Sequence, residues 1–272
     1  MSANPGAIGG AFARCRREKR AAFIPFLMAG DPDLEITERL AVALAEAGAD
    51  LLELGVPFSD PIADGPVNQA AANRALKSGT TLARTLDLAA LLRAPLGIPV
   101  VLFTYFNPIH AYGIERFAEH AARSGVDGVL CVDLPPEEAA GDYLDSFHRH
   151  RIDPIFLLAP TSTRERVRGV AAVGSGFVYY VSRMGVTGER GALPDGLARE
   201  AKELRRRLAL PLAIGFGIST PEQVAAVAAI ADGVVVGSAL VRTIEASIGR
   251  RDLVERVASQ ARALATATRR SR

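Results

Sequence analysis

AEAGADLLELG, at residues 45–55, joins the end of a helix to a buried strand and is the clearest sign of the chain's architecture. Two later segments repeat its order of residue types, ARSGVDGVLCVD at 122–133 and AAIADGVVVGS at 228–238. In each, a helix-like stretch is followed by an aspartate and then by a short apolar run. Glycine just past a helix end adopts the left-handed backbone conformation without strain. An apolar run without alternation is typical of a strand buried on both faces. The repeat predicts βα units in a parallel sheet.

Eight apolar runs of this kind follow one another along the chain. They are residues 23–28, 50–54, 100–105, 128–132, 154–158, 176–181, 212–215 and 233–236. Helices are expected between them, at residues 34–47, 114–124, 137–150, 163–173, 197–208 and 221–229. Eight strands alternating with helices favour an α/β fold closed as a (β/α)8 TIM barrel over an open doubly wound sheet.

The whole chain, residues 1–272, is expected to form a single TIM-barrel domain, because no linker-like change in composition divides it. Residues 65–92, after the second strand, are long enough for two helices. Further helices are expected near the N-terminus and in the tail beyond Ser238, after the eighth strand. These would be additions to the ring of helices that a barrel requires.

The composition excludes several classes of protein. A content of 49% hydrophobic residues argues against disorder, and a net charge of +2 is too small to favour nucleic-acid binding. No stretch approaches the ~18 uninterrupted apolar residues of a membrane span. Cys15 and Cys131 have neither a CxxC nor a Cys/His spacing, which predicts no metal site and no disulfide scaffold. We expect a cytoplasmic protein whose partners are small molecules and proteins, without nucleic acid or membrane.

Two carboxylates lie where a barrel assembles its chemistry, at the C-terminal ends of the strands. Glu53 is inside an apolar run, where an ionised carboxylate is normally excluded unless it is paired or used. If it points into the barrel, its pKa should rise and it can act as a general acid and base; a buried ion pair is the alternative. Asp64 follows in a proline-rich loop, where a turn or a helix cap is the alternative role.

Glycine-rich turns leave the seventh and eighth strands, GFGIS at 215–219 and GSA at 237–239. In barrels these two loops commonly bind a phosphate, since glycine exposes backbone N–H groups and a helix N-terminus favours an anion. Two ordinary helix-starting turns are the alternative. After the sixth strand, residues 183–193 hold three glycines in a polar series, which indicates an active-site lid or, alternatively, a plain connector.

With these residues the chain resembles a known family, the α subunit of tryptophan synthase. The matching motifs are FIPFLMAGDPD (23–33), LLELGVPFSDPIADGPVNQ (51–69), FTYFNPIHAYG (103–113), VDLPPEE (132–138), YYVSRMGVTGER (179–190), GFGIST (215–220) and VVVGSA (234–239). They occur in that family's order and cover nearly the whole chain, and ELGVPFSDP-x-ADGP is the most specific of them. Met28 and Met184 replace the small or polar residues common in the family, which we interpret as tolerated variation.

The resemblance implies a lyase of tryptophan biosynthesis that cleaves indole-3-glycerol phosphate to indole and glyceraldehyde 3-phosphate, a retro-aldol reaction without a cofactor. It implies that Glu53 is the catalytic acid and base and that Asp64 binds the indole N–H and stabilises positive charge. The side chains that it implies around the substrate are Phe26, Phe103, Tyr105, Tyr179, Thr187 and Phe216, with the Thr187 hydroxyl bonded to the catalytic aspartate. The phosphate ligands that it implies are Gly188, Gly217, Gly237 and Ser238.

The resemblance also implies a partner, the β subunit of tryptophan synthase, in an α2β2 heterotetramer. Pyridoxal phosphate is expected only in that β subunit, which would receive indole through a tunnel. The residues that resemble the family's contact surface are Pro57, Asp60, Asn107 and Pro136.

Three alternatives stay open beside this function. A stand-alone lyase would release free indole, and a noncatalytic barrel would serve only as an allosteric partner of a β subunit. Retention of Glu53, Asp64 and both phosphate loops weighs against the second. Another phosphate-binding barrel of the indole pathway would be expected to carry a catalytic lysine in a strand, and none of the eight apolar runs contains one.

Overall fold

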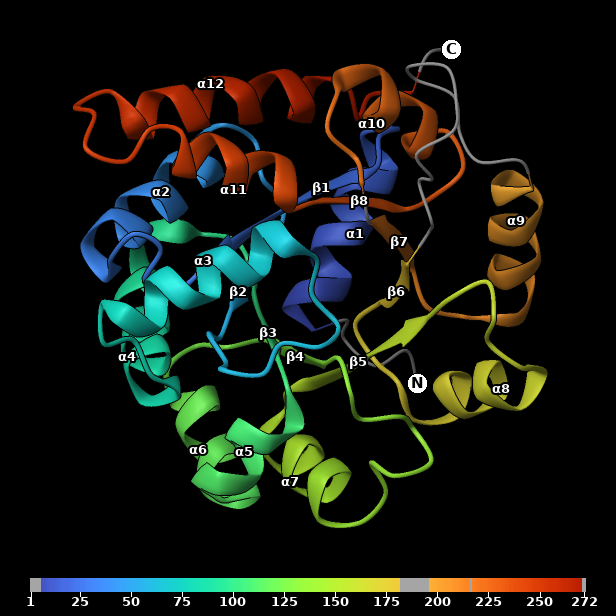
Figure 1. Cartoon of the computed structure of the whole chain (residues 1–272). Coiled ribbons are helices and arrows are strands. Elements are labelled where there is room, and N and C mark those ends of the chain that lie inside the picture. The colour runs from blue at the N-terminus through green and yellow to red at the C-terminus, as the bar shows by residue number, and fades with distance from the viewer. Residues whose placement is uncertain (1–5, 182–195, 216, 271–272) are drawn as a thin grey trace.

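Eight parallel strands close into a barrel in the computed structural model, which describes residues 6–181, 196–215 and 217–270. Each strand pairs with the next one in sequence, and β8 pairs with β1 (Figure 1). The strands are β1 (Ala22–Met28), β2 (Leu52–Gly55), β3 (Val100–Thr104), β4 (Gly128–Cys131), β5 (Asp153–Leu158), β6 (Val178–Val181), β7 (Leu212–Gly215) and β8 (Gly233–Val236). The predicted (β/α)8 barrel is confirmed.

Helices connect the strands, and most of them lie outside the ring that the strands form (Figure 1). They are α1 (Ala7–Arg17), α2 (Leu34–Glu46), α3 (Pro66–Lys77), α4 (Leu82–Leu96), α5 (Phe106–Tyr112), α6 (Ile114–Arg123), α7 (Asp142–His150), α8 (Arg164–Val173), α9 (Leu197–Arg207), α10 (Pro221–Ala228), α11 (Ser238–Glu245) and α12 (Leu253–Thr266). The two helices expected within residues 65–92 are α3 and α4, and the tail beyond β8 forms α11 and α12. The short helix α5 is absent from the sequence-based prediction because it has no apolar periodicity of its own.

One helix and one strand begin later than predicted, each just after a glycine with positive φ. The helix predicted at 137–150 begins only at Asp142, because Gly141 before it has φ +81, which is outside the helical region. The residues before Gly141 form a separate turn, in which the Ala139 N–H donates to the Pro135 carbonyl at 3.0 Å. The strand predicted at 176–181 starts at Val178, after Gly176 with φ +70.

Helix α1 closes the N-terminal end of the barrel. Its side chains Ile8 and Phe12 are buried in one cluster with the inward-facing residues Ile24 of β1 and Tyr179 of β6. The ring of Phe12 lies 5.6 Å from that of Phe177, at the foot of β6. Because this end is filled, the C-terminal mouth is left for chemistry, as in other barrels.

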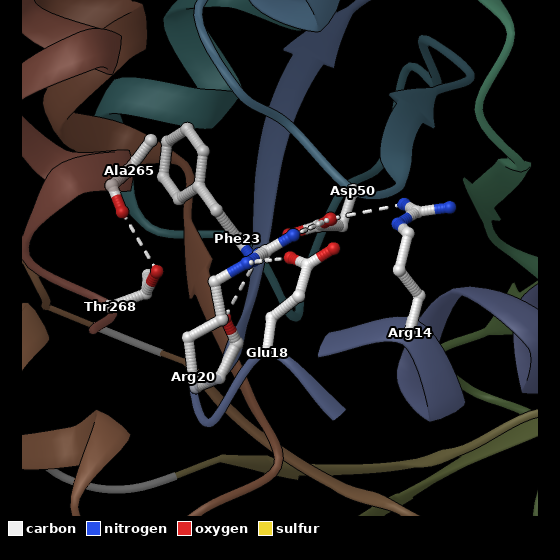
Figure 2. A network of polar contacts seen from close by, with 8 residues as sticks. Arg14, Glu18, Arg20, Phe23, Asp50, Ala265 and Thr268 are labelled. Carbon is white, nitrogen blue, oxygen red and sulfur yellow. Dashed lines mark hydrogen bonds and ion pairs between the residues drawn. The ribbon is translucent and has the colours of Figure 1, made fainter. Parts of the chain in front are cut away.

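A buried carboxylate joins α1 and β1 to this floor. Asp50, which is 2% exposed, accepts hydrogen bonds from Arg20 at 2.8 Å, Arg14 at 3.1 Å and the Phe23 backbone N–H at 3.0 Å (Figure 2). Burial alone would raise the pKa of Asp50, but the bonds from Arg20 and Phe23 outweigh it and hold the pKa below its usual value. Asp50, predicted to lie in the second strand, instead precedes β2 and ties the floor together.

Candidate active site

Glu53 points into the barrel from the middle of β2. It is level with Phe26 of β1 and Val101 of β3, in the set of residues whose side chains face inward. Glu53 is 1% exposed, and among the described residues its Oε1 has no hydrogen-bond partner. Burial raises its pKa from 4.5 to about 8. In the part of the chain that the structure describes, no cation pairs with Glu53, so the alternative of a buried ion pair does not hold there.

Asp64 lies in the loop between β2 and α3 and faces the end of β3. The Tyr105 hydroxyl donates to its Oδ2 at 3.0 Å, and the same hydroxyl accepts the Ala63 backbone N–H at 3.0 Å. Gln69 of α3 donates to the Asp64 backbone carbonyl at 2.8 Å, which fixes the loop itself. Burial raises the pKa of Asp64, and the Tyr105 hydroxyl together with the nearby Asn68 side chain offsets part of that rise. The aspartate is therefore a positioned group and not a helix cap.

Aromatic rings surround the two carboxylates. The rings of Phe26 and Phe103 meet edge to face with centroids 5.4 Å apart. Tyr179 is buried, and its pKa lies well above the usual value because of burial and the fields of Glu53 and Asp64. Together with Tyr105, these are four of the side chains expected around the substrate, and the structure brings them together at the mouth.

Two glycines at strand ends leave room for these rings. A Cβ at Gly55 of β2 would lie 2.6 Å from the Phe26 ring, and a Cβ at Gly215 of β7 would lie 2.3 Å from the Tyr179 hydroxyl. Real Cβ contacts are not that short. The rings thus occupy space that any other residue at either position would take.

The N-terminus of α11 is open at the mouth, next to Phe26. Gly237 occupies its N-cap position and no side chain caps the helix, whereas α10 is closed by a capping box between Thr220 and Gln223. A Cβ at Gly237 would lie 3.4 Å from Phe26. An uncapped helix N-terminus presents N–H groups and a positive dipole end, which suits an anion. Two loops were predicted to bind phosphate. The loop after β8 leads into a helix with a free N-terminus, whereas the loop after β7 leads into a capped helix and contains Gly217, which is exposed and has φ +79.

Several predicted site residues lie outside the described residues. They are Thr187, Gly188, Phe216, Met184 and the loop at 183–193. Met28 is buried beside Phe26. Of the residues predicted to contact a partner, Asp60 and Asn107 are exposed, whereas Pro57 and Pro136 are buried within the chain.

One polar residue of the site escaped the sequence analysis. Asn68, in the first turn of α3, has a side chain that approaches Asp64 and lowers the pKa of that carboxyl. The available signal was its position four residues after Asp64 at a helix start, where a side chain can reach back toward the preceding loop.

The described ranges contain neither a metal-binding cluster nor a membrane-spanning helix. Residues 6–181, 196–215 and 217–270 hold no group of three or more histidine, cysteine or acidic side chains able to bind a metal ion. Within the same ranges, every helix is too short or too polar to cross a membrane.

The fold and the site together define a (β/α)8 barrel with two carboxyls of raised pKa at its mouth. A family model described as tryptophan synthase alpha chain matches residues 12–269, and the chain belongs to this family. Curated relatives named tryptophan synthase alpha chain include one from Geotalea daltonii, 51% identical over 90% of this chain and 92% of its own. Another, from Gluconacetobacter diazotrophicus, is 50% identical over 96% of this chain and 97% of its own.

Solved structures agree with this assignment. Tryptophan synthase subunit alpha from Legionella pneumophila has a TM-score of 0.91 and 36% identity, with 97% of this chain and 99% of that one covered. A tryptophan synthase structure from Mycobacterium tuberculosis has a TM-score of 0.89 and 35% identity, with 98% and 100% covered. The chain is thus a lyase of tryptophan biosynthesis that cleaves indole-3-glycerol phosphate, and its family implies a β-subunit partner.

Proposed function

We propose that Glu53 and Asp64 divide the cleavage chemistry between them. Protonation of the indole at C3 makes the ring cationic, and Asp64, accepting the indole N–H, stabilises that charge. Glu53 delivers the proton to C3 and takes one from the hydroxyl beside the bond that breaks. The hydroxyl oxygen becomes the aldehyde carbonyl of glyceraldehyde 3-phosphate, and the bonding electron pair returns to the ring. Protons balance over the cycle, and the proposed reaction needs no cofactor.

The state of Glu53 carries this proposal. A carboxyl that is 1% exposed and unpaired within the described part of the chain, and whose burial raises its pKa to about 8, can exchange protons near neutral pH. A carboxyl with a structural role would instead be expected to have a cationic or hydrogen-bonded partner.

The substrate would lie across the mouth with its two ends held separately. In this proposal Phe26, Phe103, Tyr105 and Tyr179 flank the indole ring and the glycerol chain, together with Thr187 and Phe216. The phosphate binds at the N-terminus of α11, through Gly237 and Ser238, with Gly188 and Gly217 completing its site. The uncapped N-terminus of α11 supports this arrangement, because it supplies N–H groups that no side chain occupies.

We further propose that the chain works in the cytoplasm, in an α2β2 complex whose β subunit alone carries pyridoxal phosphate. Asp60 and Asn107 are exposed and can contact that subunit directly. Pro57 and Pro136 are buried, so in this proposal they shape the contact loops from beneath.

A turnover assay on indole-3-glycerol phosphate tests these roles. Because the chain has no tryptophan, indole fluorescence can be followed over little protein background. We expect cleavage that a β subunit accelerates and that is nearly abolished in Glu53→Gln and Asp64→Asn. Equal release of indole with and without the β subunit would favour a stand-alone lyase. A folded chain without turnover in either condition would favour a noncatalytic partner.

A further inference from the structure

A groove of about 250 Å³ lies between α11 and α12, the two helices that follow β8 and pack against each other (Figure 1). One face of α11 lines it with Ala239, Arg242 and Ala246, since residues three and four apart share a face of a helix. Arg256 and Gln260 of α12 line it as well. None of the described residues assigned above to the substrate lines this groove, so it is a different site from the mouth.

The groove is positively charged and holds no counter-charge among the described residues. Arg242 and Arg256 line it, and no described acidic residue does. The acidic residues of this part of the chain, Glu245, Asp252 and Glu255, all pair with arginines that do not line the groove. The side chain of Arg242 forms no hydrogen bond or ion pair with a described residue. Because like charges that share a groove repel each other, a bound anion would stabilise both arginines.

Hydrogen-bond donors on both helices remain available to a ligand. Arg256 donates its Nε–H to the hydroxyl of Ser247 at 3.1 Å, and Ser247 is 0% exposed, so one edge of the guanidinium is anchored. Its two terminal nitrogens bond no described residue. The side-chain oxygen of Gln260 accepts the Thr243 hydroxyl at 2.6 Å, which leaves its amide nitrogen without a described partner. Guanidinium and amide nitrogens only donate, and such a set of groups suits an anion.

We propose that this groove is a second anion site, which binds a small phosphate monoester. An arginine fork bonds two oxygens of a phosphate at once, and the three terminal oxygens of a phosphate can use both forks and the Gln260 amide. A phosphate carries up to ~2 negative charges against the two arginines, whereas a carboxylate carries one. The groove is smaller than the ~300–1,000 Å³ typical of sites for drug-sized ligands, so its ligand is small. It lies about one helical turn along α11 from Gly237 and Ser238 and is additional to the phosphate site proposed for the substrate.

Binding of glycerol 3-phosphate, measured by equilibrium dialysis at constant ionic strength, tests this site. The parent chain should bind two equivalents, one at the N-terminus of α11 and one in the groove. Arg242→Gln should weaken binding of the groove equivalent at least ~10-fold, because a charged donor to the phosphate is lost. Its turnover of indole-3-glycerol phosphate should equal that of the parent chain, since Arg242 is exposed and outside the proposed substrate site. Gly237→Val should instead lose the equivalent at the N-terminus of α11.

Two further variants and a second ligand refine the test. Arg251→Gln is the matched control, because Arg251 is also exposed and lies between α11 and α12 but does not line the groove. It removes the same charge and should keep both equivalents. Arg242→Lys keeps the charge without the fork and should recover only part of the binding. Glycerate, which has a carboxylate in place of the phosphate, should bind the groove at least ~10-fold more weakly than glycerol 3-phosphate.

The outcomes separate the two phosphate sites. A single equivalent in the parent chain, lost in Gly237→Val, would show that the groove binds nothing and would overturn the second site. Equal weakening by Arg242→Gln and Arg251→Gln would also overturn it, because it indicates attraction by net charge alone. Glycerate bound as tightly as glycerol 3-phosphate would overturn the assignment to a phosphate. If Gly237→Val keeps both equivalents and Arg242→Gln loses one, the groove is supported and the substrate's phosphate lies elsewhere.

Discussion

Glu53 combines burial with the ability to exchange a proton, and each property can be tested in one variant. Glu53→Gln keeps the shape of the side chain but cannot transfer a proton. We expect turnover to fall by ~10²- to 10⁴-fold, while binding of an unreactive analogue, indole carrying a propyl phosphate chain without hydroxyls, stays within a few-fold. Steady-state kinetics and analogue titration measure the two quantities. A variant that turns over within a factor of ~3 of the parent chain would falsify the acid–base role.

The same carboxyl makes the stability of the fold depend on pH. In the unfolded chain Glu53 loses its proton near its ordinary pKa of 4.5, whereas in the folded chain it keeps the proton up to about 8. The folded state therefore binds more protons between these values, and its contribution to the free energy of unfolding decreases with rising pH by up to ~1.4 kcal/mol per unit. Urea unfolding from pH 5 to 8.5 should show Glu53→Gln gaining on the parent chain as pH rises. A difference independent of pH would contradict the raised pKa.

Single residues of the site differ in how far the sequence predicts them. Glu53 stands out because a carboxylate interrupts an apolar run, and the resemblance singles out Asp64. The bonds that Asp64 makes to Tyr105 and Gln69 depend on how a loop, a strand end and a helix start come together in space. No local sequence pattern predicts these tertiary contacts, so they could be identified only from the structure.

Among the helices, α10 and α11 both follow a glycine-containing turn at a strand end, but their N-termini differ. α10 has a capping box, whereas no side chain caps α11. We expect Gly237→Val to weaken glycerol 3-phosphate binding at least ~10-fold, because the branched side chain obstructs close approach to the backbone. Thr220→Ala, which opens the cap of α10, is the control and should lower stability by ~1 kcal/mol without changing that affinity. Unaltered binding in Gly237→Val, measured by calorimetric titration, would locate the phosphate elsewhere.

Arg74 connects three elements beside the site. From α3 it donates to both carboxylate oxygens of Asp31, at 2.7 and 3.0 Å, and to Glu245 at the end of α11 at 2.7 Å. Asp31, after β1, is 1% exposed, so Arg74→Leu leaves a buried carboxylate unpaired and should lower the free energy of unfolding by about 2 kcal/mol or more.

Arg168→Leu is the matched control for Arg74→Leu, because Arg168 pairs with Glu165 on the surface of α8. Its urea midpoint should not change. Equal destabilisation of the two variants would show that the link through Arg74 has no special weight.

The boundaries of helices and strands are harder to predict from the sequence than their existence. Buried parallel strands are predominantly apolar, which made all eight recognisable. The start of α7 depends on the backbone of Gly141, and glycine in a sequence does not reveal its φ. The helix α5 contains Pro108 and has one buried side chain, Ile109, so it lacks a periodic signal.

Over the whole molecule, the apolar floor around α1 and the proposed site lie at opposite ends of the barrel. Phe12 on α1 is 3% exposed, and Phe12→Ala should reduce the free energy of unfolding by ~3–5 kcal/mol through the cavity it leaves. The kcat of the folded enzyme should stay near the parent value, since the mouth is remote from the floor. Leu91→Ala, at a position 62% exposed, is the control and should change stability by less than ~0.5 kcal/mol. A loss of kcat in Phe12→Ala without destabilisation would contradict this separation.

Gly55 and Gly215 have a consequence for how this enzyme can diversify. Each leaves its Cβ position to a neighbouring ring, with Phe26 2.6 Å and the Tyr179 hydroxyl 2.3 Å from where a Cβ would be. A side chain introduced at either glycine would therefore collide with Phe26 or Tyr179 and displace that ring within the mouth. In evolution, and in laboratory libraries that aim at substituted indoles, a larger residue at Gly55 or Gly215 therefore requires a smaller residue at Phe26 or Tyr179 first. The packing of these two glycines against the rings thus sets the order in which such mutations can be tolerated.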